Sequence, residues 1–188
     1  MKKREKNCVI FKWNPAISSY TFKNFLEDIA WKNNDSDWSV WDHKKVRRGD
    51  LFFMLKVGCG TNGIVAAGKI TGKPVIGEDW SGAGRKVYYS TYLADLMINP
   101  ETLPVISSDI LKAAISDFNW YGGHSGEILN QSQGEILKEI YAEYLKENIH
   151  EFNGRLQMIK HRNSLNDQIF IRKKLKKKLL EASVEADE

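Results

Sequence analysis

The first apolar run of the chain, residues 8–13 (CVIFKW), predicts a β-strand. It ends at residues 14–15, Asn-Pro, because proline disfavours helix at the residue before it. Apolar side chains then recur at three- and four-residue spacing over residues 22–30, which predicts an amphipathic helix. Ser19 or Thr21 is expected to cap this helix, since each offers an oxygen to the free N–H groups of its first turn.

Two apolar runs on either side of a glycine-rich segment predict a β-hairpin. Residues 51–57 (LFFMLKV) are apolar on nearly both faces, so we expect this strand in the middle of a sheet or barrel. Residues 58–63 form the turn, and residues 64–70 return as the partner strand. A long, tyrosine-rich strand is predicted over residues 85–96.

Two helices are predicted in the second half of the chain. Residues 107–118 form a short one. Ser132, followed three residues later by Glu135, has the pattern of a capping box, and apolar residues continue on one face over residues 136–145. Earlier in the chain, the polar residues 33–37 (NNDSD) predict a loop. Strands and helices together favour an α+β fold.

Length and charge divide the chain into a body and a tail. The 188 residues predict one compact domain, placed at residues 1–150, and an appendage at residues 151–188. From residue 155 onward there are nine Lys and Arg and five Asp and Glu, against 28 and 24 in the whole chain, so the rest is formally neutral. The tail is helix-permissive and concentrates its cations in Arg172, Lys173, Lys174, Lys176, Lys177 and Lys178. Such a block attracts polyanions, nucleic acid above all, or it is a solvated terminal helix that aids solubility.

Several classes of protein find no support in the sequence. It contains no transmembrane run and no signal-peptide pattern, so no membrane association is expected. Cys8 and Cys59 form neither a disulfide framework nor a metal quartet, which favours a reducing, cytoplasmic compartment. The four histidines lack metal-ligand spacing, and no nucleophile with its base is recognisable. We therefore expect no metal, no cofactor and no catalysis.

Glycine patterns in the predicted hairpin resemble phosphate-binding motifs, but their context differs. Gly58, Gly60 and Gly63 satisfy G-x-G-x-x-G, yet a β-run follows where that motif requires a helix. Residues 63–69 spell G-x-x-x-x-G-K, but Ile70 stands where a magnesium-binding hydroxyl belongs. Neither pattern predicts a nucleotide site.

A pair of tryptophans, Trp38 and Trp41, precedes the hairpin and stands beside Asp42 and His43. Indole rings next to polar groups suggest a flat aromatic pocket. The alternative is that both rings plug the end of a small barrel. The sequence pattern leaves both interpretations open.

Several short motifs together resemble one family. They are W-N-P at residues 13–15, V-x-x-G-D at 46–50 and G-I-V-A-x-G-x-I at 63–70, followed by a proline. This set resembles the EVE branch of the PUA-like superfamily, which is related to the YTH and ASCH domains. Residues 118–120 (FNW) and 125–128 (SGEI) look like the closing motif of EVE-like domains fused to restriction nucleases. The resemblance covers about residues 8–147.

The resemblance implies a small, strongly bent β-barrel with flanking helices that binds nucleic acid. Several members of the superfamily take a modified base into an aromatic cage. By similarity, Trp13 and Asn14 match pocket-edge positions and Trp41 looks like the cage tryptophan. The neighbours Trp38, Asp42 and His43 are expected to supply a second wall and contacts to the base edge. The set of further pocket candidates is Trp80 and Trp120, although Trp120 precedes a Tyr-Gly-Gly turn that is more typical of a core.

Two functions follow from these observations. The first is a non-enzymatic reader of a modified DNA or RNA base, flipped or single-stranded, with the basic tail (residues 172–178) binding phosphates. The second is a protein-interaction module whose C-terminal helix, residues 155–180, docks a partner. That partner is a separately encoded nuclease or a second copy of the chain.

Overall fold

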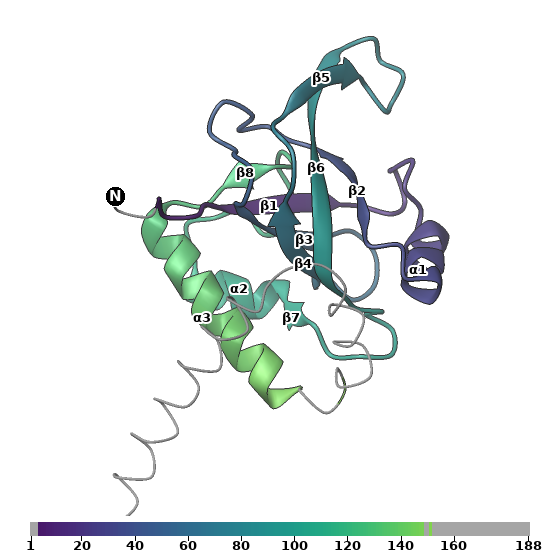
Figure 1. Ribbon diagram of the computed structural model, residues 1–188. Coiled ribbons are helices and arrows are strands. Elements are labelled where there is room, and N and C mark those ends of the chain that lie inside the picture. Colours follow the sequence, from purple (N-terminus) through teal and green to yellow (C-terminus); the bar gives the residue numbers. More distant parts are fainter. Residues whose placement is uncertain (1–3, 149–150, 152–188) are drawn as a thin grey trace, which may run out of the picture.

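An eight-stranded sheet forms the centre of the computed structural model, which describes residues 4–148 and 151 (Figure 1). The strands are β1 (Cys8–Trp13), β2 (Asp35–Ser39), β3 (Leu51–Lys56), β4 (Gly63–Ile70), β5 (Val75–Glu78), β6 (Lys86–Met97), β7 (Ile106–Ser107) and β8 (Glu127–Ile128). Their order is β2-β6-β4-β3-β1-β8, and β5 and β7 pair with β6 and β4. β1 and β3 are parallel, and the other pairs are antiparallel. The sheet curls around the long β6, which pairs with β2, β4 and β5.

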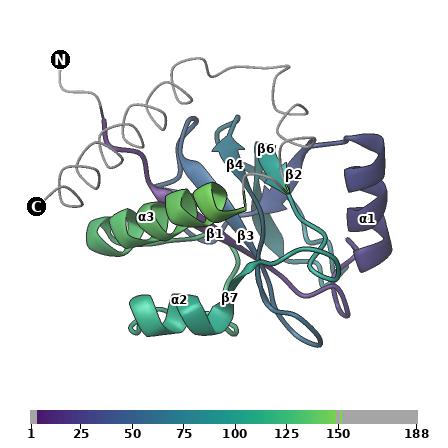
Figure 2. The ribbon, with the colours of Figure 1, turned by 90° about the horizontal axis from the view of Figure 1, so that it is seen from below.

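Helices cover the curled sheet on two sides. α1 (Phe22–Trp31) lies apart from α2 (Ser108–Ala114) and α3 (Gln131–Glu147), which lie together, as Figure 2 shows. This mixed α+β arrangement of a half-barrel and flanking helices fits the PUA-like barrel class expected from the sequence. Assignment to the EVE branch remains a prediction.

The two faces of the central strands pack into two separate cores. In β1, Val9, Phe11 and Trp13 enter a core that also holds Phe25 of α1. The alternate residue Ile10 enters a second core under α2 and α3. β3 alternates in the same way, which confirms that its nearly continuous apolar run lies in the middle of the sheet.

Local structure confirms most of the predicted elements and corrects two details. Thr21 is the N-cap of α1. The polar residues predicted as a loop belong in part to β2, which pairs with β6 and leaves most of its polar side chains in water. The cap of α3 is Asn130, whose capping-box partner is Gln133, so the helix begins before the predicted Ser132.

The predicted basic helical tail lies outside the described residues, apart from residue 151. The same holds for the six predicted phosphate-binding residues, residues 172–178 without Leu175, and for the predicted docking helix. Among the described helices, none has the length and apolar character needed to cross a membrane.

Candidate functional site

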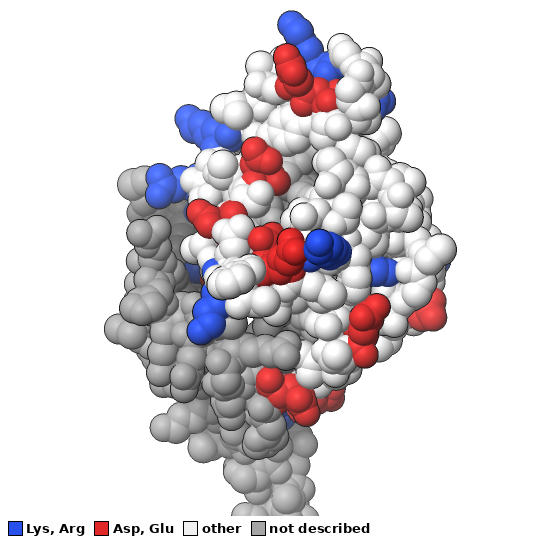
Figure 3. Space-filling view, turned by 90° about the vertical axis from the view of Figure 1, so that its right-hand side faces the viewer, with Lys and Arg blue, Asp and Glu red and all other residues white. Residues whose placement is uncertain are grey.

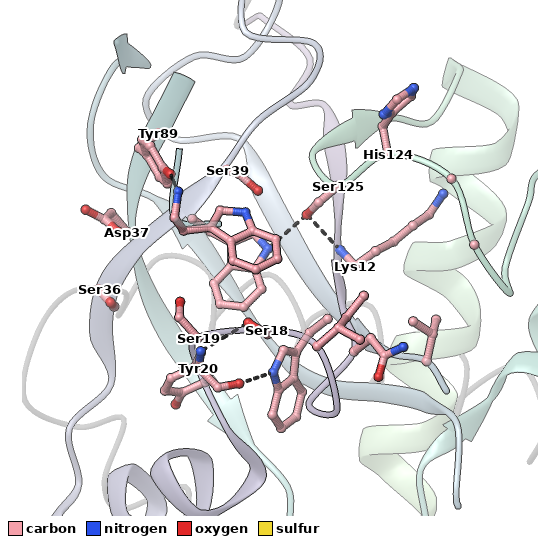
Figure 4. Close-up of a pocket in the computed structure, with 18 of the residues that line it drawn as sticks. Lys12, Ser18, Ser19, Tyr20, Ser36, Asp37, Ser39, Tyr89, His124 and Ser125 are labelled. Carbon is pink, nitrogen blue, oxygen red and sulfur yellow. Dashed lines mark hydrogen bonds between the residues drawn. The ribbon is translucent and has the colours of Figure 1, made fainter. Parts of the chain in front are cut away.

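A cavity of about 520 Å³ opens where the loop after β1, strand β2, the β5–β6 arm and the loop before β8 meet (Figure 4). Its aromatic lining comprises Trp13, Tyr20, Trp38, Trp80, Tyr89, Tyr92 and Tyr121. Its polar lining includes Asn14, Asp37 and serine hydroxyls from three segments. A cavity of this size, with aromatic walls and a few polar groups, has the composition of a site for a small planar ligand.

Trp38 forms a wall of the cavity from strand β2. Its indole Nε1 donates a hydrogen bond to the Ser125 hydroxyl oxygen at 2.8 Å. Behind the indole, Phe11 lies at 6.3 Å between ring centroids and Tyr20 meets it edge-on at 5.9 Å. Trp38 is half-buried, so the ring is held from behind while part of it remains accessible.

The Ser125 hydroxyl joins two elements of the site by hydrogen bonds. Its hydroxyl oxygen accepts from the Trp38 indole and from the backbone N–H of Lys12 at 2.9 Å, as Figure 4 shows for Lys12. These two bonds occupy both lone pairs of the oxygen. Within the described part of the chain, the hydroxyl proton has no acceptor. It is therefore available to a ligand in the cavity.

A close backbone approach holds the Ser125 loop in place. Gly126 has a φ of +78°, and a Cβ atom there would lie 2.4 Å from the Cα of Val40. The backbone N–H of Trp41 donates to the Ser125 carbonyl at 2.9 Å, and that of Gly126 donates to the Ile10 carbonyl at 2.8 Å. Only glycine permits this approach without strain.

Lys12 also lines the cavity, but its charge is already compensated. The ammonium lies 2.5 Å from a Glu127 carboxylate oxygen and 4.7 Å from the centroid of the Phe118 ring. The Lys12 side chain is only 4% exposed. A buried charge needs such a partner, so this pair is part of the architecture of the site.

Trp80 approaches the cavity from the arm between β5 and β6. Its side chain is exposed, and its backbone N–H donates to the Tyr89 hydroxyl at 3.1 Å. The arm is closed beside it by Asp79, which accepts from the Arg85 guanidinium at 2.7 Å. Hydrogen bonds from the Ser81 backbone and from Arg85 hold the pKa of Asp79 below its ordinary value. Trp80 therefore lies on a turn that the bonds of Asp79 to Ser81 and Arg85 hold in place.

The predicted pocket residues fall into three groups in the structure. Asn14, Trp38 and Trp80 line the cavity. Trp13 also borders it but is fully buried, packs on Phe25 at 4.8 Å and donates its indole N–H to the Tyr20 carbonyl, so it supports the wall from the core.

Trp120 lies in the core under the helices instead. It is fully buried, and its indole N–H donates to the Ile115 carbonyl at 2.9 Å. This placement agrees with the core role typical of its turn context and puts the residue away from the cavity lining.

The residues after Trp38 lie at the rim. The Trp41 ring is exposed and lies flat on the cavity-lining His124, at 3.6 Å between centroids and 2° between planes. His43 is stacked in the same way on Tyr88. An Asp42 carboxylate oxygen accepts a hydrogen bond from the Ile128 backbone N–H at 2.8 Å, so this carboxylate joins the loop to β8. The cage position assigned to Trp41 by resemblance is thus outside the lining, and Trp38 is inside it.

Sequence reasoning missed Ser125, Tyr20 and Tyr89 as site residues. Ser125 belongs to the quoted S-G-E-I motif, so the motif pointed to the segment but not to its hydroxyl. The two tyrosines carry no local signal, because Tyr20 reaches the cavity from the loop after β1 and Tyr89 from β6, which pairs with β2. In the described residues, no group of three or more His, Cys, Asp or Glu side chains could hold a metal ion.

Comparisons with known proteins find distant structural similarity only. No protein-family model and no curated protein matches the chain. A hypothetical protein from Leishmania major is similar with a TM-score of 0.47 and 13% identity, over 78% of this chain and 97% of that one. The YTH domain-containing protein Mmi1, solved with RNA, gives 0.47 and 12% over 78% and 87%. A protein from Pseudomonas syringae gives 0.46 and 12% over 71% and 98%. The functional argument therefore rests on the residues of this chain.

Proposed function

We propose that this protein is a nucleic-acid-binding module that takes one base, modified and flipped or single-stranded, into the cavity without catalysis of its own. The observation that carries this proposal is the cavity wall of Trp38, held by Ser125 and by core aromatics, with the exposed Trp80 beside it. We propose the same reducing, cytoplasmic setting that the sequence favours.

A nucleobase matches the chemistry of this cavity. It offers two flat faces for aromatic side chains and one polar edge for hydrogen bonds. The Ser125 hydroxyl supplies a donor, and the Asp37 carboxylate and Asn14 amide supply further groups at the lining. A methyl group on the base would add apolar contact, which contributes only about 1 kcal/mol, so selectivity for a modification would be moderate.

The first test is a titration of intrinsic tryptophan fluorescence with short DNA and RNA single strands. The strands carry 5-methylcytosine, 5-hydroxymethylcytosine, N6-methyladenine or no modification. Quenching that is stronger for one modified base is expected. Identical titrations for all strands would refute the modified-base reader.

The substitution Trp80→Ala tests whether the strand binds at the cavity. Stacking of a base on an aromatic ring is worth about 1–3 kcal/mol, so affinity for labelled strands should fall roughly 5- to 150-fold. Trp31→Ala is the matched control, because Trp31 is 83% exposed at the end of α1 and does not line the cavity. Equal effects of the two substitutions would contradict the proposed site.

One observation favours the alternative of a protein-interaction module. Val75 and Ile76 of β5 are 64% and 53% exposed, an apolar surface on the arm next to Trp80. The docking helix proposed for this function, residues 155–180, lies outside the described residues. A chain ending after residue 151 should lose self-association or nuclease binding but retain strand binding if the tail serves assembly.

A further inference from the structure

The face shown in Figure 3 offers a polyanion no continuous basic surface. On the face shown in Figure 3, basic and acidic groups are interspersed. The loop between β2 and β3 differs, because residues 44–48 read Lys-Lys-Val-Arg-Arg. Lys44, Lys45, Arg47 and Arg48 are all exposed.

The loop is anchored from within, so its cations are presented on a fixed backbone. Val46 is fully buried in the core of the half-barrel. Asp50, also fully buried, accepts from the Arg47 backbone N–H at 2.8 Å and pairs with the Arg4 guanidinium at 2.5 Å. The Arg47 guanidinium turns back to the Lys44 and Val46 carbonyls.

Little negative charge offsets the loop. Lys45 approaches the Asp42 carboxylate at 4.0 Å, with the lysine side chain 75% exposed. For Lys44, Arg47 and Arg48, the described part of the chain provides no carboxylate within ion-pair distance. Such exposed cations are available to an anionic partner.

The loop continues from a flat aromatic surface. Trp41 is 58% exposed although its ring is backed by His124 at 3.6 Å. Ser125, bonded to the Trp41 backbone N–H, and His124 both line the cavity. Figure 1 shows the same loop, between β2 and β3, beside β8. The exposed indole is therefore next to the cavity mouth, and the cations follow it along the loop toward the start of β1, where the Asn7 amide donates to the Lys45 carbonyl at 3.4 Å.

We propose that residues 41–48 form a second nucleic-acid contact surface, which we name the rim loop. The nucleotide next to the base in the cavity stacks on Trp41, and phosphates further along the strand lie against Lys44, Lys45 and Arg48. The partner is a single strand, because a stacked flanking base must be free of its complement. This inference rests on the proposed function and places the phosphate contacts in the body of the domain. An acidic peptide would engage the cations, but its carboxylate side chains offer the indole no aromatic ring to stack on.

The test uses the full chain with Lys44→Gln, Lys45→Gln and Arg48→Gln combined. Arg47 is kept because its guanidinium bonds loop carbonyls. Binding of labelled, unmodified single strands is measured between about 50 and 200 mM salt. Each lost phosphate contact reduces the magnitude of the negative slope of log K against log salt by about 0.7, so the slope of the triple variant should be shallower by roughly 2. The control combines Lys23→Gln, Lys32→Gln and Lys146→Gln, three exposed lysines on or next to α1 and α3.

Trp41→Ala should weaken binding of every strand about 5- to 150-fold and leave the salt slope unchanged. Equal slopes for the rim-loop and control variants would overturn the inference, as would a slope that responds only to neutralising residues 172–178. Tighter rim-loop-dependent binding of polyglutamate or of phosphatidylserine vesicles would also overturn it. Loss of modified-base selectivity with a retained rim-loop slope would refute only the base reader, so the two proposals fail separately.

Discussion

Ser125→Ala should destabilise the fold and release the wall of the cavity. The substitution removes one oxygen that accepts from two donors, the Lys12 backbone N–H and the Trp38 indole N–H. A buried donor left without an acceptor costs about 1–3 kcal/mol. Lys12 is buried, whereas Trp38 is half-buried and can recover part of its bond from water. The expected loss is therefore about 2–4 kcal/mol of unfolding free energy, a large share of the roughly 5–15 kcal/mol typical of a domain.

Urea unfolding followed by circular dichroism measures this loss. Ser19→Ala is the control, since Ser19 lines the cavity but is exposed and makes no hydrogen bond among those of the described residues. It should change stability by less than about 0.5 kcal/mol. At low urea, where Ser125→Ala is folded, affinity for single strands should also fall, because Trp38 is no longer oriented. A stability loss as small as that of the control would refute the reasoning that Ser125 orients the tryptophan.

Two other predictions concern the backbone of the site and the cysteines. Gly126→Ala should lower the free energy of unfolding, measured by thermal unfolding, by about 1–3 kcal/mol more than the control Gly82→Ala. Both glycines have positive φ, but of the two only Gly126 has backbone atoms within 3 Å of an added Cβ. Equal losses for the two variants would show that the backbone around Gly126 relaxes. Burial raises the pKa of the Cys8 thiol from about 9.0 to about 12, while Cys59 is exposed, so a thiol reagent at neutral pH should modify one cysteine in the native chain and two in denaturant. As pH rises from about 9.0 to about 12, the unfolded chain loses the Cys8 proton before the folded chain does. The free energy of unfolding therefore falls with rising pH across this window, and it should fall less in a Cys8→Ala variant.

The sequence was sufficient for elements whose signal is local. The apolar run of β3 predicted a strand buried on both faces, and the cap of α1 was predicted at Ser19 or Thr21, of which the structure has Thr21. It failed at the start of α3 and where strand pairing joins residues far apart in the sequence. The cap of α3 was predicted at Ser132, whereas the structure has Asn130 as the cap and Gln133 as its capping-box partner. β2 is polar because it lies at the end of the β2-β6-β4-β3-β1-β8 order and is paired on one side by β6, which no pattern within residues 33–37 could reveal.

The candidate site was predictable in composition but not in assignment. Trp38 and Trp41 are three residues apart, and sequence alone did not tell which one enters a cavity. Trp38 is in a strand, where its side is set by alternation and by the ring contacts to Phe11. Trp41 follows the strand, and its ring is set by His124, which is 83 residues further along the chain. Long-range contacts of this kind decide the roles.

The pairing of Lys12 with Glu127 affects which part of a nucleotide the cavity would accept. Lys12 is the only lysine among the described residues that line the cavity, and its charge is neutralised, so the interior offers an anion no net attraction and Asp37 at the lining repels it. The exposed cations of the rim loop offer the opposite environment outside the cavity. The uncharged base and the charged phosphates of a strand would thus bind in different places, the base inside the cavity and the phosphates outside it.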